Sequence, residues 1–276
     1  MKPICFLVLA CFTAFSVSAQ FYYKDIIATQ DLMKKHQAYR KNGVKAVDYL
    51  SFDANNQPIE GFSCQQTVSP DFNSIVIVTK TSLSGVSEST SWFNQQGQLT
   101  KSTDTADGNK TNTEYTYDAA NRLTSITSIS MSPGQASNLE KHIWAYNGQG
   151  KPEKALKISN NIDTTYINFV FDEQGNVAEE KSTRKNRALP TIYYYYNENK
   201  MLTDIVRYNN RAKKLLPDYI FEYEDSHLAT MLVSEEGTSD YQKWYYSYDD
   251  NGLKIQDACY SKLKTLIARV EYAYKF

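Results

Sequence analysis

Short stretches of alternating apolar and polar residues run along most of the chain, and EYTYDAANRLTSI shows the pattern most clearly. Within it, Tyr115 and Tyr117 are two residues apart, so they project from one face of an extended strand. Asp118 can accept backbone hydrogen bonds in a turn, and Asn121 tolerates left-handed backbone angles. Apolar residues of a returning strand follow. The stretch predicts a β-hairpin whose type I turn is closed by a bulge.

The same order of residues recurs: an aromatic, then Asp or Asn, then Gly or Asn three positions later, then an apolar residue or proline. The turn positions of the copies are Asp53, Asn94, Asp118 with Asn121, Asn147 with Gly150, Asp172 with Gly175, Asn197, and Asp249 with Gly252, and a weaker copy has Glu224. From Asn94 onward the copies recur about every 25 residues, which indicates a repeat architecture. The gap before Asn94 contains a predicted strand, 74–81, and is expected to hold a diverged repeat.

This pattern resembles the YD repeats of the RHS and teneurin type, whose consensus is YxYDxxGRL. Residues 115–123 match it with Asn121 in place of glycine, and the resemblance covers roughly residues 46–276. It implies one hairpin per repeat, joined side by side into a long curling antiparallel sheet. In the large members of the family that sheet forms a hollow shell around a cargo. The sequence leaves open whether the sheet stays open, spirals or closes.

Pairs of aromatic residues two positions apart precede the turns, as at Trp144 and Tyr146 or at Tyr194 and Tyr196. We expect them to form a ladder across adjacent hairpins and to supply the core. A lone hairpin cannot offset the cost of ordering its backbone, so it needs the burial that its neighbours provide. The predicted fold class is therefore all-β: an extended, curling antiparallel sheet of tandem β-hairpin repeats with a short N-terminal helix.

The first 45 residues differ from the repeats. Residues 1–19 contain an apolar run and end in small residues before Gln20, which is typical of a cleaved signal peptide; a membrane anchor or lipid attachment at Cys11 are the alternatives. Residues 20–45 are expected to cap the first repeat, with a short helix at 31–43. Residues 46–276 are expected to form the repeat domain.

Removal of the signal peptide would take away Lys2, leaving 29 basic and 31 acidic residues and a net charge of −2. That balance predicts no general affinity for nucleic acid. Export through the inner membrane would place the protein in the periplasm, at the cell surface or outside the cell. Cys64 and Cys259 are expected to be buried or idle thiols, although a closed sheet could bring them together for a disulfide.

No motif for catalysis, a cofactor or a metal is present in the sequence. His36, His142 and His227 are isolated and fit no metal-binding spacing. No nucleophile elbow or phosphate-binding loop occurs. The Asp and Asn residues of the turns are interpreted as turn caps, because one oxygen donor per repeat is too sparse for a calcium site. We therefore expect no enzyme, no cofactor and no metal site.

Two connections between repeats are rich in basic residues, and hairpin stacking should place both on one edge of the sheet. These residues are Arg184, Lys185, Arg187, Arg211, Lys213 and Lys214. A solvated edge is the simplest interpretation. The functional one is a docking place for an anionic glycan, a lipid headgroup or an acidic protein.

These features favour a non-enzymatic secreted, periplasmic or cell-surface repeat protein that presents a binding or scaffolding surface to a glycan or an envelope protein. The alternative is an outer-membrane β-barrel protein, because VEYAYKF at 270–276 alternates and ends in an aromatic residue. The same residues also fit the first strand of another repeat. Strands of about 8 residues are short for a membrane strand of about 9 to 11, so we do not expect membrane integration.

Overall fold

The computed structural model describes residues 20–82, 84–235 and 239–276, and the signal-peptide prediction at 1–19 lies outside them. A π-helical turn, η1 (Tyr22–Ile27), continues into α1 (Ala28–Asn42). The strands of the first half are β1 (Ala46–Phe52), β2 (Ser63–Val68), β3 (Ser74–Thr81), β4 (Gly85–Phe93), β5 (Leu99–Ala106), β6 (Asn109–Tyr117), β7 (Leu123–Met131), β8 (Asn138–Tyr146) and β9 (Pro152–Ser159). Those of the second half are β10 (Asp163–Phe171), β11 (Val177–Arg184), β12 (Arg187–Ala188), β13 (Ile192–Tyr196), β14 (Leu202–Asn209), β15 (Lys214–Glu224), β16 (His227–Ser234), β17 (Tyr241–Tyr248), β18 (Lys254–Ser261) and β19 (Leu266–Lys275).

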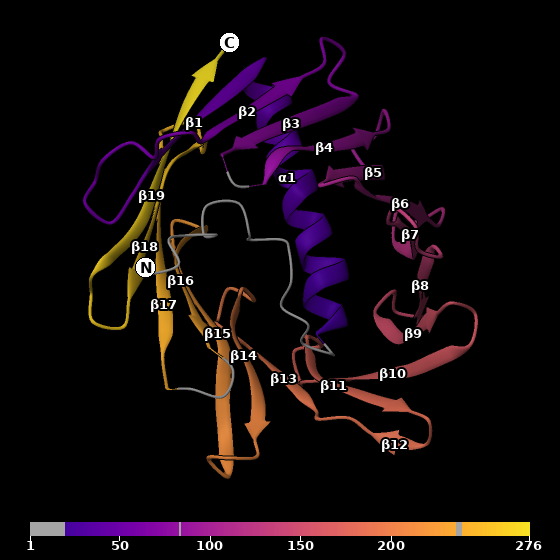
Figure 1. The fold of residues 1–276 in the computed structure, drawn as a ribbon. Coiled ribbons are helices and arrows are strands. Elements are labelled where there is room, and N and C mark those ends of the chain that lie inside the picture. The colour runs from indigo at the N-terminus through magenta and orange to yellow at the C-terminus, as the bar shows by residue number, and fades with distance from the viewer. Residues whose placement is uncertain (1–19, 83, 236–238) are drawn as a thin grey trace.

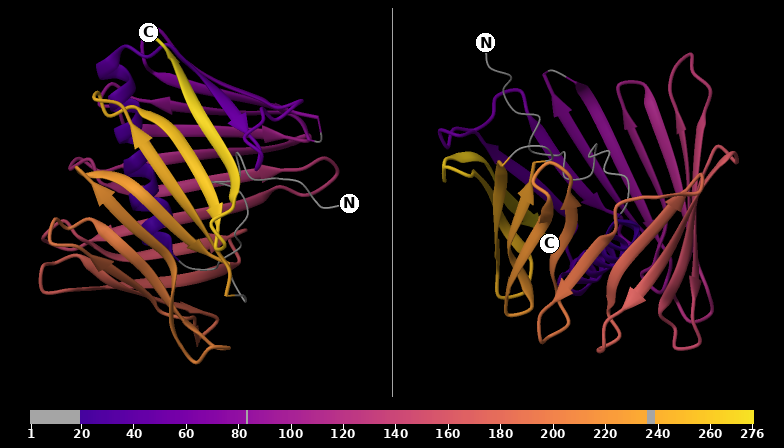
Figure 2. Two further views of the ribbon diagram at one scale, coloured as in Figure 1. Left: turned by 90° about the vertical axis from the view of Figure 1, so that its left-hand side faces the viewer. Right: turned by 90° about the horizontal axis from the view of Figure 1, so that it is seen from below.

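The strands form one antiparallel sheet that closes on itself. Each strand pairs with the next along the chain, and β19 pairs with β1 from Ala46 opposite Lys275 to Phe52 opposite Arg269. The short β12 adds to the end of β11, while β11 also pairs directly with β13. Among the described residues, the other eighteen strands therefore make a closed barrel (Figures 1 and 2). The prediction of tandem antiparallel hairpins is confirmed, and the question of closure is decided.

The predicted turn recurs with nearly constant geometry. In the copy at Asp118, the Asp118 amide donates to the Arg122 carbonyl and the Asn121 amide donates to the Asp118 carbonyl, both at 3.0 Å. The Asp118 carboxylate accepts from the amides of Ala120 and Arg122 at 2.9 Å. Asn121 has φ 62°, and the register shifts between Thr116 and Tyr117, so the type I turn with a bulge is confirmed.

The turns opened by Asn94, Asn147, Asp172, Asn197 and Asp249 repeat the two backbone hydrogen bonds of this turn. Positive φ falls at the fourth residue in each, on Gly97, Gly150, Gly175, Lys200 and Gly252. The Glu224 copy differs: Glu224 pairs with His227 across a two-residue turn made of Asp225 and Ser226, both at positive φ. The diverged repeat expected before Asn94 is present as the β2–β3 hairpin, whose turn has Phe72 at φ 57°.

The six turns that begin at Asn94, Asp118, Asn147, Asp172, Asn197 and Asp249 lie at one end of the barrel, here called the turn rim. They follow strands that all run in the same direction in the antiparallel order. The opposite end, here called the loop rim, carries the connections β11–β13, β14–β15 and β18–β19. Asp53 opens a turn of the same kind, with Asn56 at φ 60°, but it follows β1 and so lies at the loop rim.

The aromatic ladder lies on the inner face and explains why the second aromatic of the pair is so often tyrosine. The hydroxyl of Tyr146 donates to the carbonyl of Leu123 at 2.7 Å, one repeat earlier. Four other tyrosine hydroxyls donate in the same way, at 2.7 to 2.9 Å, to the carbonyl of the residue that begins the strand after the preceding turn. The pairs are Tyr117 with Leu99, Tyr196 with Val177, Tyr223 with Leu202 and Tyr274 with Lys254. Phe171 occupies the corresponding place without a hydroxyl. Each bond links neighbouring hairpins near the turn rim.

The N-terminal helix lies inside the ring of strands (Figure 1). Tyr22 packs on Tyr194 and Tyr23 on Phe221, with ring centroids 5.5 Å apart in both pairs. Tyr39, near the end of α1, contacts Tyr274 at 6.1 Å. The helix therefore packs against strands around the barrel as well as the first repeat, which is a wider role than the cap expected from the sequence. It fills interior space that the inward aromatic rows alone would leave empty.

Two apolar clusters result. One joins Ile26 to the inner residues of β7 to β15, among them Trp144, Ile167 and Phe221, and the other joins Tyr39 to β1 to β5 and Leu253. Burial of one large apolar side chain contributes about 1.5 to 3 kcal/mol, so the inward rows supply the stability that a single hairpin lacks. Within the described part of the chain, no helix has the length and apolarity to cross a membrane.

Candidate functional site

The basic residues singled out from the sequence lie at the loop rim. Arg184, Lys185 and Arg187 are at the β11–β12 turn, while Arg211, Lys213 and Lys214 are at the β14–β15 turn. Strands β11 and β14 run in the same direction on either side of β13, so both turns face the same end of the barrel. The structure thus brings the two basic groups to one edge.

Acidic residues already neutralise part of this edge. The Arg184 guanidinium forms an ion pair with Asp163 of β10 and donates from Nε to its carboxylate at 2.9 Å. Lys185 Nζ lies 3.8 Å from the same carboxylate. The hydrogen bonds from Arg184 hold the pKa of Asp163 below its usual range. These two cations therefore serve the local hairpin, and the more prominent candidate site lies elsewhere.

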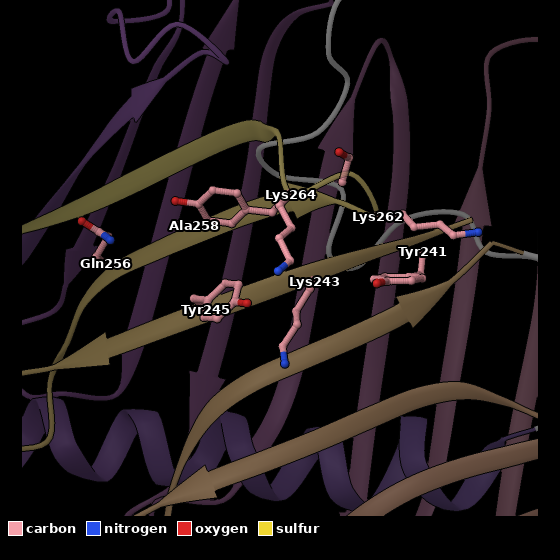
Figure 3. A pocket seen from close by; sticks show the side chains of 9 residues that line it. Tyr241, Lys243, Tyr245, Gln256, Ala258, Lys262 and Lys264 are labelled. Atoms are coloured by element: carbon pink, nitrogen blue, oxygen red, sulfur yellow. The ribbon is translucent and has the colours of Figure 1, made fainter. Parts of the chain in front are cut away.

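A groove of about 420 Å³ lies on the outer face of β17 and β18, where these strands approach the loop rim (Figure 3). It is lined by Tyr241, Lys243, Tyr245, Gln256, Ala258, Tyr260, Ser261, Lys262 and Lys264. In Figure 3 these side chains stand in front of the sheet and α1 lies behind it. The groove is therefore separate from the packed interior.

Strand alternation places the groove residues outside. Trp244 pairs with Met231, which packs on the inner cluster, and Trp244 itself is buried. Residues at odd positions of β17 must then point the other way. Tyr241, Lys243 and Tyr245 occupy those positions, and Tyr245 is 45% exposed. The strand therefore carries aromatic residues on both faces, with core residues inside and the groove outside.

The floor and walls of the groove are defined by one small residue and two rings. Ala258 lies directly opposite Tyr245 in the sheet and is buried. The rings of Tyr245 and Tyr260 meet edge to face, with centroids 5.5 Å apart. Tyr245 is 45% exposed, so part of its ring is accessible from the groove. Such rings offer a flat apolar surface with polar edges.

Three lysines surround these rings. Lys243 Nζ lies 5.5 Å from the centroid of Tyr245 and 3.0 Å from Glu222. Lys262 Nζ donates to the Ser239 carbonyl at 2.8 Å, and Lys264 has φ 61° in the β18–β19 turn. Ion pairs between exposed side chains are worth about 0 to 1 kcal/mol, so an anionic ligand can replace them. The groove combines aromatic surfaces with cationic groups.

A buried ion network inside the barrel links the N-terminal segment to β8. The Asp25 carboxylate accepts from His142 Nδ1 at 2.7 Å and from Trp144 Nε1 at 3.2 Å, and His142 Nε2 lies 3.1 Å from Glu140. Burial alone would lower the pKa of His142, but its bonds to the two carboxylates raise it to about 9. Hydrogen bonds from His142 and Lys157 bring the pKa of Glu140 to about 2. The cluster is a structural ion network.

The other histidines and the cysteines make no site. His36 stacks on Phe93 at 3.9 Å, and His227 lies over Tyr248 at 4.7 Å. Cys64 and Cys259 are both buried and free, as expected. Across residues 20–82, 84–235 and 239–276, no group of three His, Cys, Asp or Glu residues could hold a metal ion.

The sequence analysis did not predict the groove, because it considered only the aromatic pairs that precede the turns and made no prediction for Tyr241, Tyr245 or Tyr260. The missed signal lay in YQKWYYSY, where Tyr241 and Tyr245 have the opposite parity to Trp244 and Tyr246. Aromatic residues on the outer face of a closed sheet have no core to enter. Lys262 and Lys264 lie in the β18–β19 connection, so this connection of the loop rim is also basic.

The family model for the RHS repeat matches residues 93–129, which span the Asn94 and Asp118 hairpins. The resemblance of the repeat to the RHS/YD type is therefore confirmed. A comparison with curated proteins finds no match.

Several solved structures show a partial likeness. The TcdB2–TccC3–Cdc42 crystal structure is 14% identical, with a TM-score of 0.35, over 78% of this chain but only 12% of that chain. A porin-like protein from Bacteroides uniformis is 9% identical, with a TM-score of 0.40, over 84% of this chain and 96% of its own. A porin-like protein from Bacteroides vulgatus is 12% identical, with a TM-score of 0.27, over 84% and 98% of the two chains.

Proposed function

We propose that this RHS/YD-repeat-like chain is an exported, non-enzymatic binding protein that holds an acidic saccharide in the outer groove of β17 and β18. The observation that carries the proposal is the cluster of three outward tyrosines among three lysines above the small Ala258. A stacking surface and a cationic rim in one groove match a ligand that has both flat apolar faces and negative charge.

The saccharide class follows from the shape of the groove. A pyranose ring has one flat face of C–H groups, which packs well against the exposed face of a phenol ring. Tyrosine provides that contact at a low cost in side-chain entropy, since its ring has few rotatable bonds. The edge-to-face pair of Tyr245 and Tyr260 presents two such surfaces at an angle, which suits two successive sugar units.

The acidic character follows from the lysines. Lys243, Lys262 and Lys264 all border the groove, and the loop rim beyond it carries Lys213 and Lys214 at the β14–β15 turn. A row of cations beside aromatic rings attracts carboxylate or sulfate groups over some distance. This attraction weakens when salt is added, because salt screens the charges. A glycan of the cell envelope or of the surroundings is the partner class that this chemistry fits.

Calorimetric titration with oligosaccharides tests the proposal. The probes are an oligogalacturonate, a sulfated oligosaccharide and a neutral maltooligosaccharide as reference. Tyr260→Ala should weaken binding of an acidic probe about two- to twelvefold, since aromatic contacts contribute roughly 0.5 to 1.5 kcal/mol. Lys264→Gln should weaken binding and flatten its dependence on salt.

Matched controls lie on other strands. Tyr166→Ala removes a tyrosine of β10 that is 57% exposed, and Lys154→Gln removes an exposed lysine of β9. Both variants should bind as the unchanged protein does. Equal binding of acidic and neutral probes, no binding at all, or the same loss in Tyr166→Ala as in Tyr260→Ala would each refute the groove as an acidic-saccharide site.

The closed sheet favours a second candidate, an outer-membrane barrel protein, in which β19 with most of VEYAYKF would be a membrane strand. Opposing it, exposed charges occur within the strands, at Lys101, Glu114, Lys154 and Lys181. A lysine at the middle of a bilayer costs about 2 to 4 kcal/mol. Cell fractionation separates the two candidates, because release by carbonate or high salt without detergent excludes the membrane barrel.

A further inference from the structure

The start of the described chain is buried against a carboxylate. The Gln20 amide donates to Glu180 Oε1 at 2.8 Å, and Gln20 is only 1% exposed. The amides of Phe21 and Tyr22 donate to the same carboxylate at 3.2 and 3.0 Å, and the Tyr194 hydroxyl donates to it at 2.9 Å. Glu180 is fully buried on the inner face of β11. Its described hydrogen-bond donors are three amides and a phenol, all neutral groups in a continuous chain.

A buried carboxylate of this kind is costly unless a cation meets it. Burial raises the pKa of Glu180 above its usual range, and the hydrogen bonds from Tyr194 and from the amides of residues 20–22 offset only part of that effect. Lys24 is near enough for its charge to interact with Glu180, although burial lowers the pKa of that lysine. The Gln20 nitrogen lies 2.8 Å from the carboxylate, within hydrogen-bond distance.

Two further features of Gln20 are consistent with a free amine there. Its φ is 85°, a backbone conformation that costs energy for a residue other than glycine, and cleavage would remove this cost because a terminal residue has no preceding carbonyl. In addition, Gln20 Oε1 and Ser182 Oγ are buried and have no hydrogen-bond partner in the described structure. A terminal ammonium group on Gln20 would have three N–H donors, whereas its peptide amide has one.

The sequence supplies the event that would create such a terminus. Gln20 directly follows the small residues Val17, Ser18 and Ala19, a site typical of signal peptidase. Hydrolysis of the peptide bond between Ala19 and Gln20 consumes one water, leaves a carboxylate on Ala19 and leaves an amine on Gln20. That amine takes up a proton near neutral pH, since a terminal amine has a pKa of about 7.7 to 8.0 in an open chain.

We propose that the α-amino group of Gln20, released by cleavage after Ala19, docks on Glu180 as a buried ion pair that fixes the N-terminal segment inside the barrel. Processing then adds a positive charge at the position of the Gln20 nitrogen, where the uncleaved chain has a neutral amide. The Gln20 side chain strengthens this arrangement, since its Nε2 donates to Asp218 Oδ2 at 2.8 Å. This hydrogen bond holds the side-chain amide of Gln20 away from the α-amino group of the same residue. It therefore hinders cyclisation of the terminal glutamine to pyroglutamate.

The mass of the exported protein gives the first test. Purified from a Gram-negative host, the chain should begin at Gln20 with its glutamine uncyclised, and a different first residue would overturn the proposal. In the folded protein the terminal glutamine should not lose ammonia over days, whereas the urea-unfolded chain should lose it. Equal rates in the two states would show that the amine is not docked.

Stability measurements test the ion pair itself. A chain that starts at Gln20 is compared with one that carries a Gly-Ser extension before Gln20, each with Glu180 and with Glu180→Gln. The extension should raise the unfolding equilibrium constant about tenfold or more with Glu180 and change it less than about twofold with Glu180→Gln. An equal effect in both backgrounds, or none in either, would overturn the ion pair. If Glu180→Gln does not fold, the cyclisation rates above decide the matter.

Discussion

Removal of the tyrosine hydroxyl that links one repeat to the next gives a direct measure of how the barrel is stabilised. In Tyr146→Phe the ring remains against the core, and the Arg122 guanidinium keeps its place 4.7 Å from the ring centroid. The change that remains is loss of the 2.7 Å bond to the Leu123 carbonyl. Burial raises the pKa of Tyr146 to about 12, so its hydroxyl is a donor throughout the usual pH range of an unfolding experiment.

The expected cost follows from the energetics of one hydrogen bond. A bond of this kind contributes about 0.5 to 1.5 kcal/mol net, which corresponds to a roughly two- to twelvefold change in the unfolding equilibrium constant. For a chain of this size, about 1 kcal/mol lowers the melting temperature by roughly 2 to 4 °C. The urea midpoint should fall while its slope stays constant, because the surface exposed on unfolding is unchanged.

The assay is urea unfolding followed by tyrosine fluorescence and circular dichroism, with Tyr208→Phe as the matched control. Tyr208 lies on β14 and is 45% exposed, so its change should leave the midpoint within error. Tyr223→Phe, which removes the 2.8 Å bond to the Leu202 carbonyl, should cost about as much as Tyr146→Phe, and the two should add, because several strands separate them. If Tyr146→Phe and Tyr208→Phe prove indistinguishable, the hydroxyl bonds do not hold neighbouring repeats together.

Two further predictions concern the turns and the interior. Lys200 has φ 59° at the position where Gly175 has φ 76°, so Lys200→Gly should stabilise the protein by a few tenths of a kcal/mol and Gly175→Ala should destabilise it by about 1 kcal/mol in the same melting experiment; the opposite signs would contradict the turn geometry. Because Asp25 and Glu140 raise the pKa of His142 to about 9, the stabilisation by its charge is complete below pH 6.5 and disappears as pH rises through 9. Its size is roughly 2 to 4 kcal/mol, and His142→Gln should remove this pH dependence; a slope that persists in the variant would assign it to other groups.

The parts of the fold that could be predicted are those that depend on residues close together in the sequence. The turn at Asp118 is specified by residues within five positions of one another, since the carboxylate accepts its own neighbours' amides and Asn121 tolerates positive φ. Strand alternation depends only on spacing two residues apart. Both signals survive in the sequence whatever the rest of the chain does. The repeated hairpins and the inward aromatic ladder could therefore be predicted residue by residue.

The candidate sites were less predictable because they depend on which face of the sheet is outside. Tyr241 and Tyr245 are similar to the core tyrosines in sequence, and only the inward position of Trp244 shows that they point outward. Likewise, Glu180 is an ordinary acidic residue of a strand in the sequence, and only the fold brings the Gln20 amide onto it. Contacts between residues far apart in sequence create both features.

The amino-acid order was sufficient to establish hairpins, their period, the turn type and an aromatic inner face, because each depends on neighbours a few residues apart. The number of strands in the ring, the pairing of β19 with β1 and the place of α1 were decided only in three dimensions. A sheet closes when its accumulated twist and the volume of its contents agree. Here the contents are the N-terminal segment itself, packed against strands around the ring, and no local pattern encodes that fit.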